Sequence, residues 1–147
     1  MRNSTLFSNS LNPTRALLSI KPRFASAIFK GEKRFEFRKN IFSRPVDIVI
    51  VYATVPVRRV VGEFDVRSVI GEPLPSLWER TRRFAGIEED FFFRYFEGRE
   101  YGYAIEVGEV RTYERPFCPI EHLGIRPPQS FVYLESTPDT IPKLSEA

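Results

Sequence analysis

Alternation of hydrophobic and polar residues divides the first part of the chain into short predicted elements. Residues 15–20 form an apolar run that is typical of a buried strand. Phe24, Ala27 and Ile28 follow at the spacing of one helical face, and Gly31 stands where a left-handed cap would end that helix. These signals predict a strand followed directly by a short helix.

The next segment, residues 33–39, alternates with the period of a strand. Phe35 and Phe37 are expected to face one way, while Glu36 and Arg38 face the other, because successive side chains of a strand point to opposite faces. This strand therefore carries its charged residues along one face.

Two further strands are predicted in the middle of the chain. Residues 46–53 are almost wholly apolar and β-branched, which predicts a central strand that is buried on both faces. Residues 59–69 alternate again, and Gly62 within them predicts a bulge or a bend.

Two helices interrupt this series of strands. The first is predicted after Ser76, a candidate N-cap, and the second covers residues 88–96. Phe92, Phe93 and Phe96 form the expected core stripe of the second helix. We expect both helices to pack across one end of the sheet.

The remaining pattern predicts a strand at residues 101–110, one helical turn at 120–123 and a last strand at 130–134. Short alternating strands with helices in the crossovers favour an α+β fold, a small mixed or antiparallel β-barrel of five to six strands. We predict one domain at residues 15–135, a flexible N-terminal arm at 1–14 and a flexible C-terminal tail at 136–147.

Composition narrows the class of protein. The chain has 147 residues, of which 42% are hydrophobic, and this suits a single globular domain. We expect a cytoplasmic location and no membrane association, because the sequence has neither a long apolar run nor a signal-peptide pattern. One histidine, His122, and one cysteine, Cys118, cannot form a conventional zinc site, so we expect no metal and no cofactor. His122 itself is interpreted as a loop or turn residue.

Charge is concentrated in one stretch. Residues 15–44 hold nine lysines and arginines against two glutamates, which gives +7, whereas the net charge of the whole chain is +3. The remaining residues therefore sum to −4. A basic face on a slightly acidic body favours an anionic partner; a solvated surface on which charges happen to cluster is the alternative.

The residues with the clearest chemistry lie in this stretch. Glu36 and Arg38 are two apart on a predicted strand, about 7 Å along the chain, and Lys33 stands at the entrance of that strand. Together they are suited to hydrogen-bond a base edge, to hold a phosphate or to activate a water molecule if burial lowers the pKa of the lysine. A surface ion pair on an edge strand is the simpler interpretation.

This segment resembles the ASCH family signature GxKxxExR. The four fixed positions of the signature are held here by Gly31, Lys33, Glu36 and Arg38. The preceding SIKPRFASAIF and the later VIVYATVPVRRVVGEF, FFFRYFEG, YGYAIEV and PPQSFVYLE are similar to the elements that accompany it. The resemblance runs from about residue 17 to residue 135 and points to ASCH proteins labelled as predicted transcriptional regulators.

The resemblance implies a PUA-like barrel of five or six strands with a cleft beside the motif helix. It also implies RNA binding, and some members are enzymes that remove the acetyl group of N4-acetylcytidine or cut RNA. The amidohydrolase members use a Lys, a Thr and a Glu. Lys33 matches their lysine, but Glu36 occupies the place of their threonine, which argues against that activity here.

Two functions follow as hypotheses. The first is an RNA-binding regulatory module, with DNA as a possible partner, in which Lys21, Arg23, Lys33 and Arg38 contact phosphates and Glu36 accepts a hydrogen bond from a base. The second is a small hydrolase acting on a modified nucleoside or on RNA, with Lys33 and Glu36 as catalytic residues. A protein-interaction domain without a nucleic-acid ligand is the third alternative, and the oligomeric state is open.

Further binding candidates lie outside the basic stretch. Tyr52 and Trp78 are candidates for base stacking, although core packing is the commoner role of such residues. Gln129 and Ser130 are candidates to close the cleft with amide and hydroxyl groups; turn hydrogen bonds are their simpler role.

Overall fold

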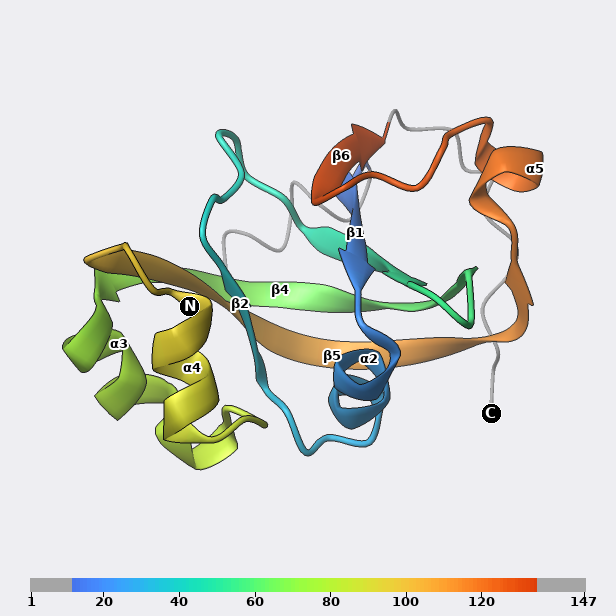
Figure 1. The fold of residues 1–147 in the computed structure, drawn as a ribbon. Helices are drawn as coiled ribbons and strands as arrows, with labels where there is room; N and C mark the ends of the chain where they lie inside the picture. The colour runs from blue at the N-terminus through green and yellow to red at the C-terminus, as the bar shows by residue number, and fades with distance from the viewer. Residues whose placement is uncertain (1–11, 135–147) are drawn as a thin grey trace.

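The computed structural model describes residues 12–134, which form one mixed sheet with helices packed on it (Figure 1). The elements are β1 (Arg15–Ile20), α2 (Pro22–Phe29), β2 (Phe35–Arg38), β3 (Ile48–Ala53), β4 (Arg59–Pro73), α3 (Leu74–Thr81), the 3-10 turn η1 (Arg82–Phe84), α4 (Glu89–Tyr95), β5 (Tyr101–Phe117), α5 (Pro119–Leu123) and β6 (Phe131–Leu134). The predicted order of strands and helices is confirmed. The predicted tail at 136–147 lies outside the described residues, as does the predicted arm except for residues 12–14.

The six strands have the order β2-β5-β4-β3-β1-β6. β1 and β3 are parallel, and the other neighbouring pairs are antiparallel. The predicted α+β class with a mixed six-stranded sheet is therefore confirmed. Within residues 12–134 the sheet is not closed into a barrel, because its edge strands β2 and β6 are each four residues long and pair only with their inner neighbours.

Gly62 explains how α2 lies so close to the sheet. The pairing of β4 shifts register at Gly62, which confirms the predicted bulge. A Cβ atom added at Gly62 would lie 2.6 Å from the carbonyl oxygen of Arg111 and 2.8 Å from the ring of Phe29. Only glycine therefore lets the last residue of α2 pack directly on this part of β4.

Three elements differ from the sequence-based expectation. β4 and β5 continue to Pro73 and Phe117, beyond the predicted residues 69 and 110, because further register shifts keep the two long strands paired as they bend. Ser76 is not the N-cap of α3, because that helix begins at Leu74 and the Ser76 hydroxyl instead donates to the Glu72 carboxylate at 2.6 Å.

Three apolar clusters hold the layers together. The first packs α2 on β1 and β3, and the third lies on the opposite face of these strands. The second joins α3 and α4 to β2 and β5, with the rings of Phe92 and Phe37 at a centroid distance of 5.1 Å. Trp78 belongs to this second cluster, 5.0 Å from Phe92, so its place is in the core.

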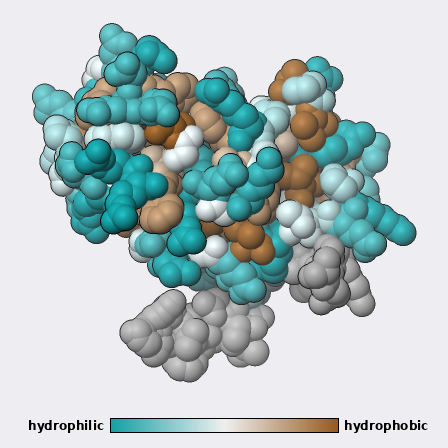
Figure 2. Space-filling model, turned by 90° about the horizontal axis from the view of Figure 1, so that it is seen from below, coloured by the Kyte–Doolittle hydropathy of each residue, from teal (hydrophilic) through white to brown (hydrophobic). Residues whose placement is uncertain are grey.

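Seen from below in Figure 2, the molecule shows a mostly hydrophilic face with separate hydrophobic patches. None of the helices within residues 12–134 combines the length and the hydrophobicity needed to cross a membrane.

Candidate functional site

The site begins where β1 passes into α2. Lys21 has an extended backbone, and Pro22 starts the helix, where its missing N–H costs no hydrogen bond. Gly31 has a φ of +82°, which confirms the predicted left-handed residue at the end of the helix. The N–H groups of Glu32 and Lys33 both donate to the carbonyl oxygen of Ala27, so the chain turns sharply into β2.

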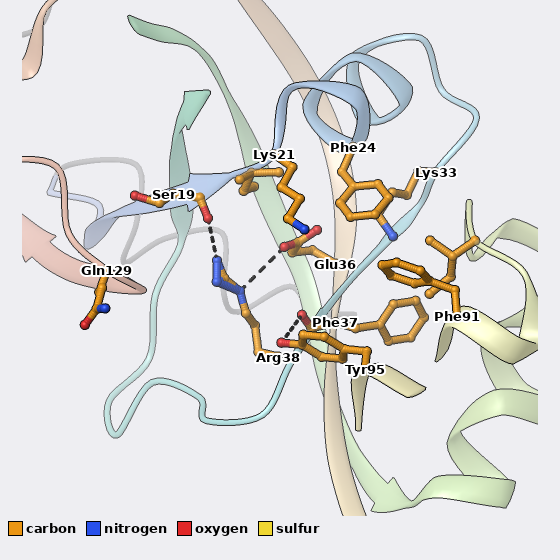
Figure 3. Close-up of a pocket in the computed structure, with 12 residues that line it drawn as sticks. Ser19, Lys21, Phe24, Lys33, Glu36, Phe37, Arg38, Phe91, Tyr95 and Gln129 are labelled. Atoms are coloured by element: carbon orange, nitrogen blue, oxygen red, sulfur yellow. Dashed lines mark hydrogen bonds and ion pairs between the residues drawn. The ribbon is translucent and has the colours of Figure 1, made fainter. Parts of the chain in front are cut away.

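A cavity of about 270 Å³ lies between the end of β1, the start of α2, β2 and α4. Figure 3 shows its charged and polar side chains beside a set of aromatic rings. Its polar lining consists of Ser19, Lys21, Lys33, Glu36, Arg38 and Gln129, and its aromatic lining of Phe24, Phe37, Phe91 and Tyr95.

Lys33 is 2% exposed and donates a 2.8 Å hydrogen bond from Nζ to the carbonyl oxygen of Ala85. The same Nζ lies 5.1 Å from the ring centroid of Phe24 and 4.9 Å from that of Phe37. Burial lowers the pKa of Lys33 to about 8, and the negative charge of Glu36 partly offsets this effect. The ammonium is thus still charged at neutral pH but gives up its proton more readily than an exposed lysine.

Gly86 lies directly against the stem of Lys33. A Cβ atom at Gly86 would be 2.6 Å from the Cβ and Cγ atoms of Lys33, and the φ of Gly86 is +72°. The loop that precedes α4 therefore holds the lysine stem in place through both Ala85 and Gly86. This contact has no local signal in the sequence, because the two segments are more than fifty residues apart.

Glu36 and Arg38 line the cavity together, as the alternation along β2 predicted. They are 7% and 9% exposed, and Arg38 Nε lies 3.5 Å from Glu36 Oε2. Arg38 Nη2 donates a 2.9 Å hydrogen bond to the carbonyl oxygen of Ser19. Among the described residues, Arg38 Nε has no hydrogen-bond partner. A buried donor without a partner is costly, so this N–H is available to an acceptor on a ligand.

Aromatic side chains wall the cavity on the side of α4. The rings of Phe24 and Phe91 meet edge to face at a centroid distance of 5.6 Å. The Tyr95 hydroxyl donates to the carbonyl oxygen of Phe37 at 3.3 Å, and burial raises the pKa of Tyr95, so it is a neutral hydroxyl in this wall. Phe91 and Tyr95 were not anticipated as site residues, yet their i, i+4 spacing beside the core stripe is a recognisable signal.

The other predicted site residues are distributed around this cavity. Lys21 and Gln129 line it, and Arg23 lines a neighbouring cavity. Ser130 is exposed and does not line it, although its carbonyl oxygen accepts a 3.1 Å hydrogen bond from the backbone N–H of Ser19.

Tyr52 lies away from the cavity. It is 7% exposed in the third apolar cluster, together with Leu17 and Ile50. Val49 and Val51 of the same strand face the α2 side, so alternation along β3 directs Tyr52 to the opposite face of the sheet. The structure therefore does not bring Tyr52 together with Lys33, Glu36 and Arg38.

The described residues contain no group of three or more His, Cys, Asp or Glu side chains placed to hold a metal ion. His122 belongs to α5, and its ring lies 5.0 Å from that of Phe117.

Comparison with known proteins adds the following. Residues 18–117 match the family model of the ASCH domain. An ASCH domain-containing ribonuclease from Zymomonas mobilis subsp. mobilis is 32% identical over 127 residues, which cover 81% of this chain and 83% of the relative. The large ribosomal subunit protein uL22 from Ureaplasma parvum serovar 3 is 30% identical over 120 residues; these cover 81% of this chain but 39% of that relative. The crystal structure of ASCH from Zymomonas mobilis has a TM-score of 0.76 and 32% identity, with 82% of this chain and 87% of that chain covered.

Proposed function

The chain belongs to the ASCH domain family, and from this premise we propose that it binds RNA in the Lys33 cavity and cleaves it there. One observation carries the proposal: Lys33, Glu36 and Arg38 are all buried and line a single cavity with aromatic walls. The ribonuclease from Zymomonas mobilis, similar over most of both chains, supports RNA as the substrate class.

The size and lining of the cavity suit one nucleotide of a single strand. Its volume of about 270 Å³ is near the lower end of small-molecule sites, which is about 300 Å³. Phe24, Phe91 and Tyr95 offer ring surfaces for a base, and stacking of a base on an aromatic side chain contributes about 1–3 kcal/mol. Lys33 and Arg38 offer positive charge to the adjoining phosphate.

The same three charged residues can divide the chemistry of RNA cleavage between them. The Glu36 carboxylate accepts the proton of a ribose 2′-hydroxyl as the 2′-oxygen attacks the adjacent phosphorus. The bond to the 5′-oxygen breaks, and that oxygen takes a proton from the Lys33 ammonium. The products are a 2′,3′-cyclic phosphate and a free 5′-hydroxyl, so atoms and charge balance without a further reactant.

Arg38 acts on the charge that develops on the phosphate. Its Nη2 is held by the carbonyl oxygen of Ser19, whereas its Nε has no hydrogen-bond partner in the described chain. A fixed guanidinium donor that faces the phosphate stabilises the transition state, because it needs no reorganisation during the reaction. Lys33 contributes to the same stabilisation before it gives up its proton.

The test compares a short single-stranded RNA with DNA of the same sequence. Wild-type protein and Lys30→Met, which alters an exposed lysine on the same segment, should cleave the RNA and leave the DNA intact. Lys33→Met should lose at least about a hundredfold in rate, the range for removal of a proton donor. If the protein binds RNA but does not cleave it, the regulatory module is favoured. If it releases acetate from N4-acetylcytidine and does not cleave RNA, the amidohydrolase is favoured. Either result contradicts the proposal.

A further inference from the structure

A second cavity adjoins the first. Its volume is about 310 Å³, and it shares Phe24, Ile87 and Phe91 with the Lys33 cavity. The edge-to-face pair of Phe24 and Phe91 therefore forms a wall between two hollows of similar size. Phe91 lines both cavities, so its ring is within reach of a molecule on either side.

Arg23 contacts both rings of this wall. Its guanidinium carbon is 4.7 Å from the ring centroid of Phe24 and 5.3 Å from that of Phe91. Within residues 12–134 the guanidinium makes these ring contacts but no hydrogen bond or ion pair, so its N–H groups remain available. The contacts to two rings hold an exposed positive charge above the boundary of the two hollows.

The floor of the second cavity lies against the reactive lysine. Gly86 lines the second cavity, and the side-chain stem of Lys33 in the first cavity packs on its backbone. On this side the Gly86 backbone lies between the second cavity and the Lys33 stem. The two cavities are therefore adjacent, with three lining residues in common.

Glu88 supplies the one carboxylate of the second cavity. It is exposed and directly precedes α4, and its carboxylate makes no hydrogen bond or ion pair within the described residues. A carboxylate only accepts hydrogen bonds, so it matches a base that presents amino or imino N–H donors. Guanine offers two adjacent donors, and cytosine and adenine offer an amino group. Uracil offers one imino N–H between two carbonyl oxygens, which repel a carboxylate, so it is the poorest match.

We propose that the second cavity binds the nucleotide next to the one in the Lys33 cavity, with its base on Phe91, its donor edge at Glu88 and the linking phosphate at Arg23. The inference rests on the proposed RNA substrate and extends it to a preference: amino-bearing bases, guanine first, are favoured over uracil at one flanking position.

The experiment measures binding of trinucleotide RNAs with a fixed central base, in which each flank is varied through the four bases. Wild-type protein should bind guanine over uracil by about fivefold or more at one flank, from the low end of base discrimination by a paired side chain. Glu88→Ala should reduce this ratio to near one, whereas Glu89→Ala, on the same helical turn, should retain it. Arg23→Gln should weaken every trinucleotide alike, and Arg115→Gln, an exposed arginine near the far end of β5, should weaken none.

The outcomes separate the second cavity from the proposed function. Equal binding of all flanking bases, or a preference that survives Glu88→Ala, contradicts the second cavity while RNA binding itself stands. Absence of RNA binding by the wild-type protein contradicts both proposals. All four altered side chains are exposed, so correct folding of the variants is expected and is checked by thermal unfolding.

Discussion

Arg38 on β2 donates a 2.9 Å hydrogen bond to the carbonyl oxygen of Ser19 on β1, although three strands separate β2 from β1 in the sheet. The bond is possible because the sheet curves so that β2 faces the end of β1. This contact closes one side of the cavity and orients the guanidinium. The positioning of Arg38 is thus a property of the curved sheet as well as of the motif.

Substitution of Arg38 by lysine should weaken RNA binding by about tenfold or more, even though the charge remains. A lysine has a single ammonium group and cannot both reach the carbonyl oxygen of Ser19 and present a second fixed donor to a phosphate. Arg34→Lys is the matched control, because Arg34 lies just before the same strand and stacks on the exposed ring of Phe84. Fluorescence titration measures the RNA affinity of both variants. An equal loss of affinity in the two variants would contradict the role of Arg38.

Cleavage should decline as the pH rises above about 8. The pKa of Lys33 is lowered to about 8 by burial, so the ammonium that donates the proton is lost above this value. We expect kcat/KM to fall toward a tenfold loss per pH unit, while RNA binding measured over the same range falls less steeply. A rate that is flat or still rising at about pH 9.5 would exclude Lys33 as the proton donor.

The stability of the fold should rise with pH between about 8 and 10.5. In this window the unfolded chain still holds the proton of Lys33, whose ordinary pKa is 10.5, while the folded protein has released it. The unfolded state then binds more protons, and the free energy of unfolding increases with pH. Urea unfolding at several pH values measures this slope, and Lys33→Met should remove the part that arises from this residue. An unchanged slope in the variant would show that the side chain is not buried as described.

Gly86→Ala should reduce both stability and cleavage, whereas Gly98→Ala should reduce stability alone. Both glycines have positive φ values, so alanine costs about 1 kcal/mol or more at either position. Only at Gly86 would the new Cβ collide with the stem of Lys33, since nothing lies within 4 Å of a Cβ at Gly98. Thermal unfolding and single-turnover cleavage of the two variants separate backbone strain from displacement of the lysine. Equal cleavage rates would contradict the positioning role of Gly86.

The local pattern of the chain was sufficient for the order of elements and for part of the site. Gly31 ends α2, Gly62 marks the bulge, and Glu36 and Arg38 share one cavity, all as predicted. These features depend on backbone conformation and on the two-residue period of a strand, both of which are set by neighbouring residues.

What the sequence did not predict depends on contacts between distant segments. The bond of Lys33 to Ala85 arises from the docking of the 85–87 loop on α2 and β2, and this has no local signature. Tyr52 was a stacking candidate because it ends an apolar strand, but only the packing of both sheet faces decides which side it occupies. The curvature that brings Ser19 to Arg38 is likewise a property of the whole sheet.

The most direct test of the account is cleavage of a DNA strand that contains a single ribonucleotide, with the new ends identified by mass spectrometry. We predict that the wild-type protein cuts only after the ribonucleotide and leaves a 2′,3′-cyclic phosphate and a 5′-hydroxyl. Glu36→Gln, which keeps the size of the side chain, should bind the strand and cut it at least about a hundred times more slowly. Equal cleavage by Glu36→Gln, or products with a 5′-phosphate, would contradict the proposed chemistry of this cavity.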